Sequence, residues 1–301
     1  MNPSEPADDD VVLAVDIGGT KMAVGIVGRR GRLLWSARAP TPHDGSDPVA
    51  VLDRLVEDVP PSFVPSACGV GIGGPMTEGG ELVSPLNIPA WRDFALRDHL
   101  VRSVGLKTWI DNDAKALALG EGWVGAGVGR RSYLSMVVST GIGGGIVLDG
   151  RLLDGDAGNA GHVGHLVVEP EGRPCPCGGR GCLEAEASGL AIAAVTGRPA
   201  AEADDAVRRR SGRLVGRGVA DVCNLLDLRL ATVAGSVALG FGAPFFAAAQ
   251  AEIDARCRLR FSRGATIVAS AMGAEGPLIG AAANAGRALG WLAERPGADG
   301  P

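Results

Sequence analysis

The chain has 301 residues, 46% of them hydrophobic, and carries a formal net charge of −5. This length is sufficient for a large core and for two domains, whereas the negative charge argues against non-specific nucleic-acid binding, which needs a basic surface that displaces counterions. The N-terminal MNPSEPADDD lacks the basic and then apolar pattern of a secretory signal, and the apolar runs are too short or too interrupted by glycine for a membrane span. We therefore expect a cytoplasmic protein that binds neither nucleic acid nor membrane.

A repeated pattern organises the chain. Residues 11–34 and residues 134–153 both read as an apolar strand, a glycine-rich turn, a second strand, a tight glycine turn and a third strand that starts with Arg-Leu-Leu. Two such copies indicate two related α/β lobes, each of which begins with an antiparallel hairpin. We place the N-terminal lobe at residues 1–117 and the C-terminal lobe at residues 118–284, with a last helix at about 285–301 that packs back on the first lobe.

The two glycine-rich turns, DIGGTK (16–21) and STGIGGG (139–145), are candidate phosphate-binding sites. Glycine lets a ligand approach the backbone closely, and successive N–H groups in a turn form a concave anion site. One such turn is more simply explained as a plain hairpin, but two turns at matching points of a repeat could hold a triphosphate from both sides. Neither turn matches the P-loop or the dinucleotide-binding pattern. The candidate nucleotide-binding residues in the turns are Asp16, Gly18, Gly19, Thr20, Lys21, Thr140, Gly141 and Gly143.

Asp16 ends the first strand, beside the first glycine turn. Its carboxylate would repel a phosphate unless a cation lay between them, so the position favours Mg²⁺ bound through water. A side chain that caps the turn explains the same residue equally well.

A second polar cluster, WIDNDAKA (109–116), follows an apolar strand at its C-terminal end, where ligands bind in open α/β sheets. Asp113 then begins a helix, and an Asp that caps a helix stabilises it by about 1 kcal/mol. One cap is enough, however, and three polar residues in a row exceed that need. If the ligand is a sugar, one Asp can accept a hydroxyl proton while the neighbouring Asn112 holds an adjacent hydroxyl, as phosphoryl transfer requires.

Cys175, Cys177 and Cys182 form a compact set separated by Pro and Gly residues that force tight turns, and His162 and His165 precede them. Three thiolates and one imidazole complete a tetrahedral zinc site with no open position for water, so we expect a structural zinc. The spacing leaves open which histidine is the fourth ligand. A zinc deaminase is excluded because its H-x-E and P-C-x-x-C patterns are missing, and a zinc-finger DNA module fits badly with the acidic net charge.

Together these motifs resemble the ROK family of bacterial sugar kinases and related repressors. The resemblance covers nearly the whole chain, from DIGGTK through DNDA, STGIGGG and CPCGGRGCLEAEASG to AGSV, and the cysteine signature is its most specific part. It implies the family fold, a two-lobed α/β ATPase of the actin/hexokinase (ribonuclease H-like) type with a cleft between the lobes. It also implies ATP, Mg²⁺ and a structural Zn²⁺ as cofactors, a sugar as the small-molecule partner, and a homodimer as the common assembly.

The resemblance further implies individual roles. Asp113 would be the general base that deprotonates the sugar 6-hydroxyl for in-line attack on the γ-phosphate of ATP. Glu184 would bind hydroxyls at the far end of the sugar ring, and His165 would be both a zinc ligand and a sugar neighbour, which places the zinc segment at residues 165–182. The other implied contacts are Gly74, Asn87 and Asn112 with the sugar, Gly235 and Ser236 with the adenosine, and Cys175, Cys177 and Cys182 with the zinc.

One position departs from the family pattern A-G-E-x-G-H, whose Glu contacts the ring hydroxyls. This chain reads AGHVGH, so His162 stands in place of that Glu, as it does in bacterial N-acetylmannosamine kinases. An imidazole can donate and accept hydrogen bonds where a carboxylate only accepts them, which would suit an amino or acetamido group at ring position 2 or 3. Amino sugars of antibiotic pathways, cyclitols and ordinary hexoses stay open as substrates.

Repressors of the family carry a winged-helix domain ahead of the first strand, and the ten residues before Val11 are too few for one. We therefore expect an ATP-dependent kinase that phosphorylates the 6-hydroxyl of a hexose or amino-hexose. The alternatives are phosphorylation of a cyclitol by the same mechanism, and a non-catalytic sugar-binding sensor, which would require a defective phosphate turn or base.

Overall fold

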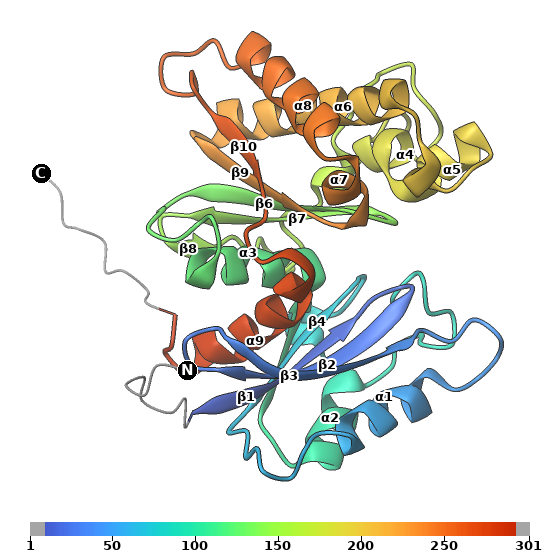
Figure 1. Cartoon of the computed structure of the whole chain (residues 1–301), viewed down its shortest axis with the longest axis vertical. Coiled ribbons are helices and arrows are strands. Elements are labelled where there is room, and N and C mark those ends of the chain that lie inside the picture. The colour runs from blue at the N-terminus through green and yellow to red at the C-terminus, as the bar shows by residue number, and fades with distance from the viewer. Residues whose placement is uncertain (1–9, 293–301) are drawn as a thin grey trace, which may run out of the picture. The chain divides into compact units, whose positions relative to one another are not determined.

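The computed structural model describes residues 10–292 (Figure 1). The chain divides into two compact units: unit 1 contains residues up to Val124 together with a C-terminal segment from Ala274, and unit 2 contains Gly125–Gly273. Each unit is built on one five-stranded mixed sheet with helices packed against it. Of the last helix expected at about 285–301, residues 293–301 lie outside the described range.

The sheet of unit 1 has the strand order β3-β2-β1-β4-β5. A hairpin of β1 and β2 is extended antiparallel by β3, while β4 and β5 add parallel strands on the other side of β1. Every residue of β1 is buried, because helices cover both faces of this sheet. The strands are β1 (Val11–Ile17), β2 (Lys21–Gly28), β3 (Leu33–Pro40), β4 (Cys68–Ile72) and β5 (Thr108–Asn112).

Four helices complete unit 1: α1 (Pro48–Glu57), α2 (Leu96–Val104), α3 (Asp113–Val124) and α9 (Gly276–Ala288), with one 3-10 turn, η1 (Glu78–Gly80). Helices α1 and α2 cover one face of the sheet and α9 the other (Figure 1). Small residues allow α9 to approach the strands closely, since a Cβ at Gly69 would collide with the carbonyl of Ala281. The Asn284 side chain of α9 also donates to the Val70 carbonyl at 2.8 Å. This contact fixes α9 against the central strands of unit 1.

The sheet of unit 2 has the order β10-β9-β6-β7-β8. Read in the reverse direction, β8-β7-β6-β9-β10, this order matches that of unit 1. Strands β6 and β7 form the hairpin, β8 extends it antiparallel, and β9 and β10 are the parallel strands. The sequence repeat therefore extends to the topology of the whole sheet. The strands are β6 (Tyr133–Val138), β7 (Ile142–Leu148), β8 (Arg151–Leu152), β9 (Leu230–Ala234) and β10 (Thr266–Ala269).

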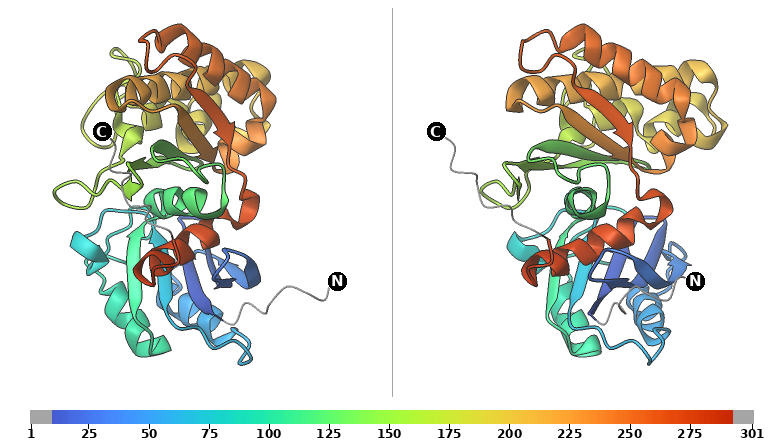
Figure 2. Two further views of the ribbon diagram at one scale, coloured as in Figure 1. Left: turned by 90° about the vertical axis from the view of Figure 1, so that its left-hand side faces the viewer. Right: turned by 60° about the vertical axis from the view of Figure 1, so that its left-hand side comes forward.

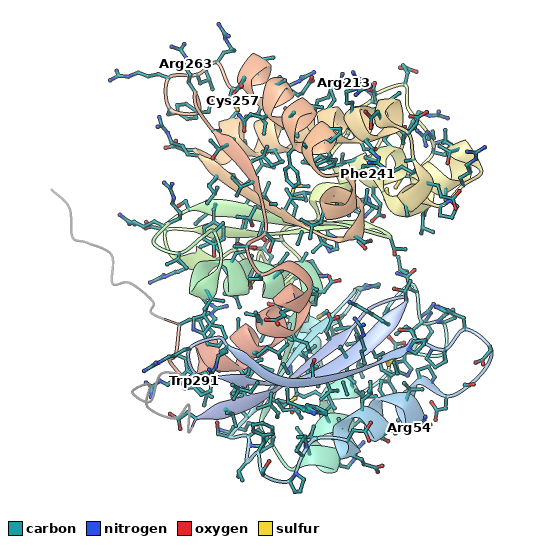
Figure 3. The ribbon with its side chains drawn as sticks, in the orientation of Figure 1. Arg54, Arg213, Phe241, Cys257, Arg263 and Trp291 are labelled. Atoms are coloured by element: carbon teal, nitrogen blue, oxygen red, sulfur yellow. The ribbon has the colours of Figure 1, made fainter. Side chains whose placement is uncertain are left out.

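Helices α6 and α8 lie side by side over one face of this second sheet (Figure 2). Two glycines of α6 make the contact close, because a Cβ at Gly216 would meet the Ala249 carbonyl at 2.5 Å and Gly212 is as tightly placed against Phe245. Phe241 and Cys257 are buried in the core of this unit, whereas the labelled arginines, such as Arg263, are exposed (Figure 3). The helical segments are η2 (Val163–His165), α4 (Leu183–Ala187), α5 (Gly189–Thr196), η3 (Ala200–Glu202), α6 (Asp205–Leu226), α7 (Ser236–Phe241), α8 (Ala243–Arg256) and, joining the units, η4 (Gly273–Glu275).

Candidate functional site

The first glycine turn joins β1 to β2 in unit 1. The Gly18 N–H donates to the Lys21 carbonyl at 2.9 Å and closes the turn. The Thr41 hydroxyl donates to the Gly18 carbonyl at 2.7 Å, and His43 Nε2 lies 2.8 Å from the Gly19 carbonyl. The side chains of Thr41 and His43 therefore occupy these two carbonyls. The remaining N–H groups of the turn are the backbone groups suited to bind an anion.

Two carboxyl groups lie at the same edge of the unit 1 sheet. Asp16 pairs with Gly71 across β1 and β4, and Ile72 pairs with Asn112 across β4 and β5, so the strands end together. Burial and then the charge of Asp113 raise the pKa of Asp16 to about 7, against the opposing effect of Lys21. The structure therefore brings Asp16, the predicted cation residue, close to Asp113, the predicted base.

The polar residues after β5 also serve the start of α3. The Ala114 N–H is within hydrogen-bond distance of Asn112 Oδ1 at 3.0 Å and of Asp113 Oδ1 at 2.8 Å, as expected at a helix N-terminus. Asp111 pairs with the buried Lys115 one turn later, with Nζ and Oδ1 3.2 Å apart. Helix capping thus fixes the direction in which Asn112 and Asp113 leave the strand, and it uses one oxygen of each side chain.

The predicted sugar residues Gly74 and Asn87 lie on loops of unit 1. Asn87 is exposed and packs directly on the first glycine turn, since a Cβ at Gly19 would lie 2.6 Å from Asn87 Cβ. Gly74 follows β4 in open surroundings, where an added Cβ would approach only the Met76 nitrogen, at 3.9 Å. Within unit 1, Asn87, a predicted sugar residue, thus lies in contact with the predicted phosphate turn.

The second glycine turn joins β6 to β7 in unit 2. The Ser139 N–H donates to the Gly141 carbonyl at 2.9 Å, and the first residues of α5 donate to the turn from outside: Gly189 N–H to Ser139 at 2.8 Å and Leu190 N–H to Thr140 at 3.2 Å. As in the first turn, groups outside the hairpin are hydrogen-bonded to the carbonyls of the turn. Thr140 and Gly143 lie in this hairpin as predicted nucleotide residues, half-buried.

The segment AGSV lies against this second turn. A Cβ at Gly235, whose φ is 100°, would collide with the Val138 carbonyl, so only glycine fits the position. The Ser236 and Ser139 hydroxyls are 2.9 Å apart. The apolar run 231–237 predicts a single strand, but β9 ends at Ala234 and α7 begins at Ser236, because the chain turns at Gly235.

The predicted metal ligands come together in unit 2. His165, Cys175, Cys177 and Cys182 offer ligand atoms that all lie within 4.8 Å of one another. Cys177 Sγ and Cys182 Sγ are 3.7 Å apart, and Cys175 Sγ is 3.7 Å from His165 Nδ1. In a tetrahedral site with zinc–sulfur bonds of about 2.3 Å, neighbouring sulfur atoms lie about 3.8 Å apart. The four residues therefore fit a zinc ion, and the sulfur separation is far longer than a disulfide bond.

The two histidines of AGHVGH have different surroundings. The short turn η2 places His165 among the cysteines, whereas His162 precedes the turn and its ring centroid is 6.0 Å from that of His165. The segment rests on β7, because Cβ atoms at Gly161 and Gly164 would collide with the carbonyls of Gly144 and Ile142. His162 is exposed, which is compatible with contact to a ligand.

Two acidic residues after the last cysteine have contacts that the sequence alone does not reveal. Glu184 Oε2 accepts a hydrogen bond from the Ile142 N–H at 2.8 Å, at the second glycine turn. Glu186, which is 2% exposed, accepts from Arg210 Nη2 at 2.7 Å and from the Arg173 N–H at 2.6 Å. The pattern Glu-Ala-Glu in the short helix α4 gives no sign of these contacts. Glu186 thus anchors the start of the cysteine loop to α4 and α6.

Comparison with known proteins shows which class of protein this chain resembles. A glucokinase of Thermotoga maritima is 41% identical over 186 residues, 60% of this chain and 58% of that protein. An N-acetylmannosamine kinase of Citrobacter koseri is 37% identical over 247 residues, 76% of this chain and 84% of that protein. The structure of a ROK family glucokinase from Streptomyces griseus in complex with glucose and AMPPNP matches with a TM-score of 0.80 and 30% identity, over 90% of this chain and 98% of the other.

The fold and these similarities define a carbohydrate kinase that uses ATP. The chain belongs to the ROK family, whose sequence profile matches residues 12–287. The family resemblance and the two-lobed hexokinase-type fold class predicted from the sequence are both confirmed. Within residues 10–292, no helix has the length and apolar character that crossing a membrane requires.

Proposed function

We propose that the protein transfers the γ-phosphate of ATP to the 6-hydroxyl of a hexose or amino-hexose. The observation that carries this proposal is the pair of carboxyl groups in unit 1, where Asp113 begins α3 directly after β5 and raises the pKa of the buried Asp16. Phosphoryl transfer needs a base for the attacking hydroxyl and a cation for the phosphates, and the two carboxylates are suited to these separate tasks.

Asp113 acts as the general base. Its carboxylate accepts the proton of the attacking sugar hydroxyl as the oxygen–phosphorus bond forms and the bond to the leaving ADP breaks. Capping of α3 supports this role, because the hydrogen bond from the Ala114 N–H to Oδ1 orients the carboxylate before the sugar arrives. Asn112 holds an adjacent hydroxyl, and Gly74 and Asn87 line the sugar subsite.

The glycine turns bind the phosphates. Backbone N–H groups of Gly19 and Thr20 in unit 1, and of Thr140, Gly141 and Gly143 in unit 2, are the proposed donors. Gly18 closes the first turn through its bond to the Lys21 carbonyl, and the Lys21 side chain is a nearby positive charge. Gly235 and Ser236 lie beside the adenosine. Asp16 would hold Mg²⁺ through water, since carboxylate oxygens are the ligands that Mg²⁺ prefers and a divalent cation would offset the repulsion that Asp16 experiences from Asp113. Bound there, Mg²⁺ neutralises phosphate charge.

The sugar is recognised in unit 2 by His162, His165 and Glu184. The relatives include both a glucokinase and an N-acetylmannosamine kinase, so the family alone does not choose between a plain and an N-acylated sugar. His162, which can donate as well as accept, favours an amino or acetamido substituent. We propose an amino-hexose as the preferred substrate class.

The zinc has a structural role. His165, Cys175, Cys177 and Cys182 would supply four ligands, which leaves no coordination position for substrate. The zinc would hold the cysteine loop in place directly before α4, since Cys182 precedes the first residue of that helix. Its contribution to sugar binding is then indirect, through the position of His165 and Glu184.

A coupled assay of ADP release tests the proposal. The purified protein is mixed with ATP and Mg²⁺ and with glucose, mannose, N-acetylglucosamine, N-acetylmannosamine, glucosamine or inositol, and the product is analysed by phosphorus NMR for the position of the phosphate. We expect sugar-dependent ADP release and a 6-phosphate. A product from inositol alone would favour the cyclitol alternative, and a complete absence of sugar-dependent release across the panel would favour a non-catalytic sensor. Size-exclusion chromatography with light scattering tests the proposed homodimer.

A further inference from the structure

Glu184 makes a contact that a sugar ligand does not need. Its Oε2 accepts the Ile142 N–H at 2.8 Å, and the same oxygen would lie 2.6 Å from a Cβ at Gly141. Ile142 is 6% exposed, so its N–H depends on a protein acceptor rather than on water. One oxygen of the carboxylate therefore closes the second glycine turn from outside the hairpin.

Unit 1 contains a matching contact. Asn87, another predicted sugar residue, lies against Gly19 of the first glycine turn, with its Nδ2 2.8 Å from the position of a Cβ on that glycine. In both units a glycine of the turn thus leaves space for a polar side chain that is proposed to face the sugar. Both units therefore place a proposed sugar residue directly against a glycine of the phosphate turn, and in unit 2 a hydrogen bond adds to the packing.

We propose that Glu184 couples the sugar subsite to the second phosphate turn. This inference rests on the proposed function, in which the sugar contacts Glu184 and the phosphates of ATP contact the turn. The carboxylate has two oxygens, so it can hold the Ile142 N–H with one and a sugar hydroxyl with the other. Its loss removes the acceptor of a buried N–H and loosens the turn, so Glu184 governs nucleotide binding even without sugar.

The coupling also acts in the opposite direction, because linkage between two sites is reciprocal. Gly141 lies in the nucleotide turn, and its backbone is outside the left-handed region, so alanine is tolerated there by the backbone itself. The added methyl group would meet only the carboxylate end of Glu184 within 4 Å. Gly141→Ala therefore displaces this carboxylate, and a change in the nucleotide turn alters the affinity for sugar.

Two substitutions of Glu184 separate its two roles. Glu184→Gln keeps an oxygen that can accept the Ile142 N–H, whereas Glu184→Ala removes it. The measurement is the Kd of Mg·AMPPNP by isothermal titration calorimetry in the absence of sugar. We expect the alanine variant to bind about tenfold more weakly than the wild type, the glutamine variant to bind within about twofold of it, and both to have a raised KM for sugar. His162→Asn is the matched control, with a changed KM for sugar and an unchanged Kd for Mg·AMPPNP.

Unchanged sugar-free binding of Mg·AMPPNP by Glu184→Ala, with a raised KM for sugar, overturns the coupling and leaves Glu184 as a sugar ligand only. A wild type that binds no Mg·AMPPNP overturns the proposed function as well, so the two failures are distinct. Zinc content and Tm are measured for each variant. If Glu184→Ala does not fold, Gly141→Ala decides the matter: a rise of about tenfold in the Kd for sugar, measured by calorimetry, supports the coupling, and an unchanged Kd overturns it.

Discussion

The Asp16 and Asp113 carboxyl groups interact at the edge of the unit 1 sheet, where burial and the charge of Asp113 together raise the pKa of Asp16 to about 7. The two residues come from strand ends that are far apart in the sequence, and β4 lies between those strands in the sheet. The charged form of Asp16 is disfavoured here, so a cation bound at this edge of the sheet would stabilise the carboxylate. Lys21 lowers the pKa but does not cancel the effect.

The first prediction concerns the pH dependence of stability through Asp16. In the folded protein its pKa is about 7, against 3.8 as the ordinary value. Between these pH values the folded state binds the proton and the unfolded state does not, so the stability contributed by this group is lost as the pH rises through this window. Asp16→Asn removes the charge, so we expect its Tm relative to the wild type to rise by at least about 2 °C more at pH 8 than at pH 5, measured without Mg²⁺.

The same variant has a functional readout. Because Asn cannot supply the anionic oxygen for Mg²⁺, Asp16→Asn should lose at least about tenfold in turnover while it gains stability at high pH. An equal change in Tm at pH 5 and pH 8 would contradict the placement of the raised pKa on Asp16. Full retention of turnover would contradict its role with the cation.

The second prediction concerns the general base. Asp113→Asn keeps the size of the side chain and an oxygen for capping α3, but it cannot accept the hydroxyl proton. We expect kcat to fall by about 10²- to 10⁴-fold, with the Kd for sugar changed by less than about threefold, because binding does not require proton transfer. Steady-state kinetics and calorimetric sugar binding provide the two measurements.

A neighbouring carboxylate provides the control for this substitution. Asp111 pairs with the buried Lys115, so Asp111→Asn should lower Tm through the loss of this ion pair and leave kcat within about threefold of the wild type. Turnover retained in Asp113→Asn, or lost equally in both variants, would remove Asp113 from the role of base.

The third prediction concerns the metal. The purified wild type should contain about one zinc per chain, and Cys177→Ser should lose it and lower Tm, because metal-binding free energy adds to folding free energy. Cys177 is exposed, so its replacement leaves no cavity and the loss in Tm reports on the metal. Elemental analysis and thermal melts with and without a chelator measure both effects.

Cys223 provides the matched control, since it is fully buried in the core of unit 2 and lies outside the metal cluster. Cys223→Ser should retain zinc even where a buried hydroxyl lowers its Tm. Wild-type protein that is stable and metal-free after purification would contradict the zinc site.

The fourth prediction concerns Glu186. Burial raises the pKa of this carboxyl, but the Arg173 N–H and the side chains of Arg173 and Arg210 outweigh it and lower the pKa below 4.5. The stability contributed by Glu186 is therefore present above the unfolded pKa and lost as the pH falls through the folded one. We expect Glu186→Gln to lower Tm at pH 7 by an amount that corresponds to about 1–3 kcal/mol, and the difference to shrink as the pH is lowered below 4.5.

Glu171→Gln is the control, because Glu171 and Glu186 both line an open cavity of about 490 Å³ and Glu171 is exposed. It should leave Tm within about 1 °C. A Glu186→Gln variant as stable as the wild type at pH 7 would contradict the anchoring role of this residue.

The sequence predicted the features that depend on local pattern. The glycine hairpins, the start of a helix at Asp113 and the gathering of three closely spaced cysteines all follow from residues near one another in the chain. Contacts across the fold were missed. The bond between Glu184 and the Ile142 N–H depends on how α4 packs beside β7, and the ion pairs of Glu186 depend on the position of α6. No periodicity in a single sequence encodes such packing.

The choice between the two histidines illustrates the same limit. Spacing alone allows either His162 or His165 to join the cysteines, and the family resemblance favoured His165. The structure gathers His165 with them because η2 turns the backbone between the two residues. The position of Gly235 likewise depends on the Val138 carbonyl of another strand, which the apolar run of β9 does not reveal.

The last prediction concerns His162 and the choice of sugar. His162 is exposed, lies outside the group of metal ligands and stands where the family pattern has Glu. We expect His162→Glu to raise the ratio of kcat/KM for glucose over that for N-acetylmannosamine by at least about tenfold, because a carboxylate accepts from ring hydroxyls and cannot donate to an acetamido oxygen. His162→Gln, which still donates and accepts, is the control and should keep the wild-type ratio within about threefold. Zinc content should be unchanged in both variants, and a ratio unaffected by His162→Glu would mean that another residue selects the sugar.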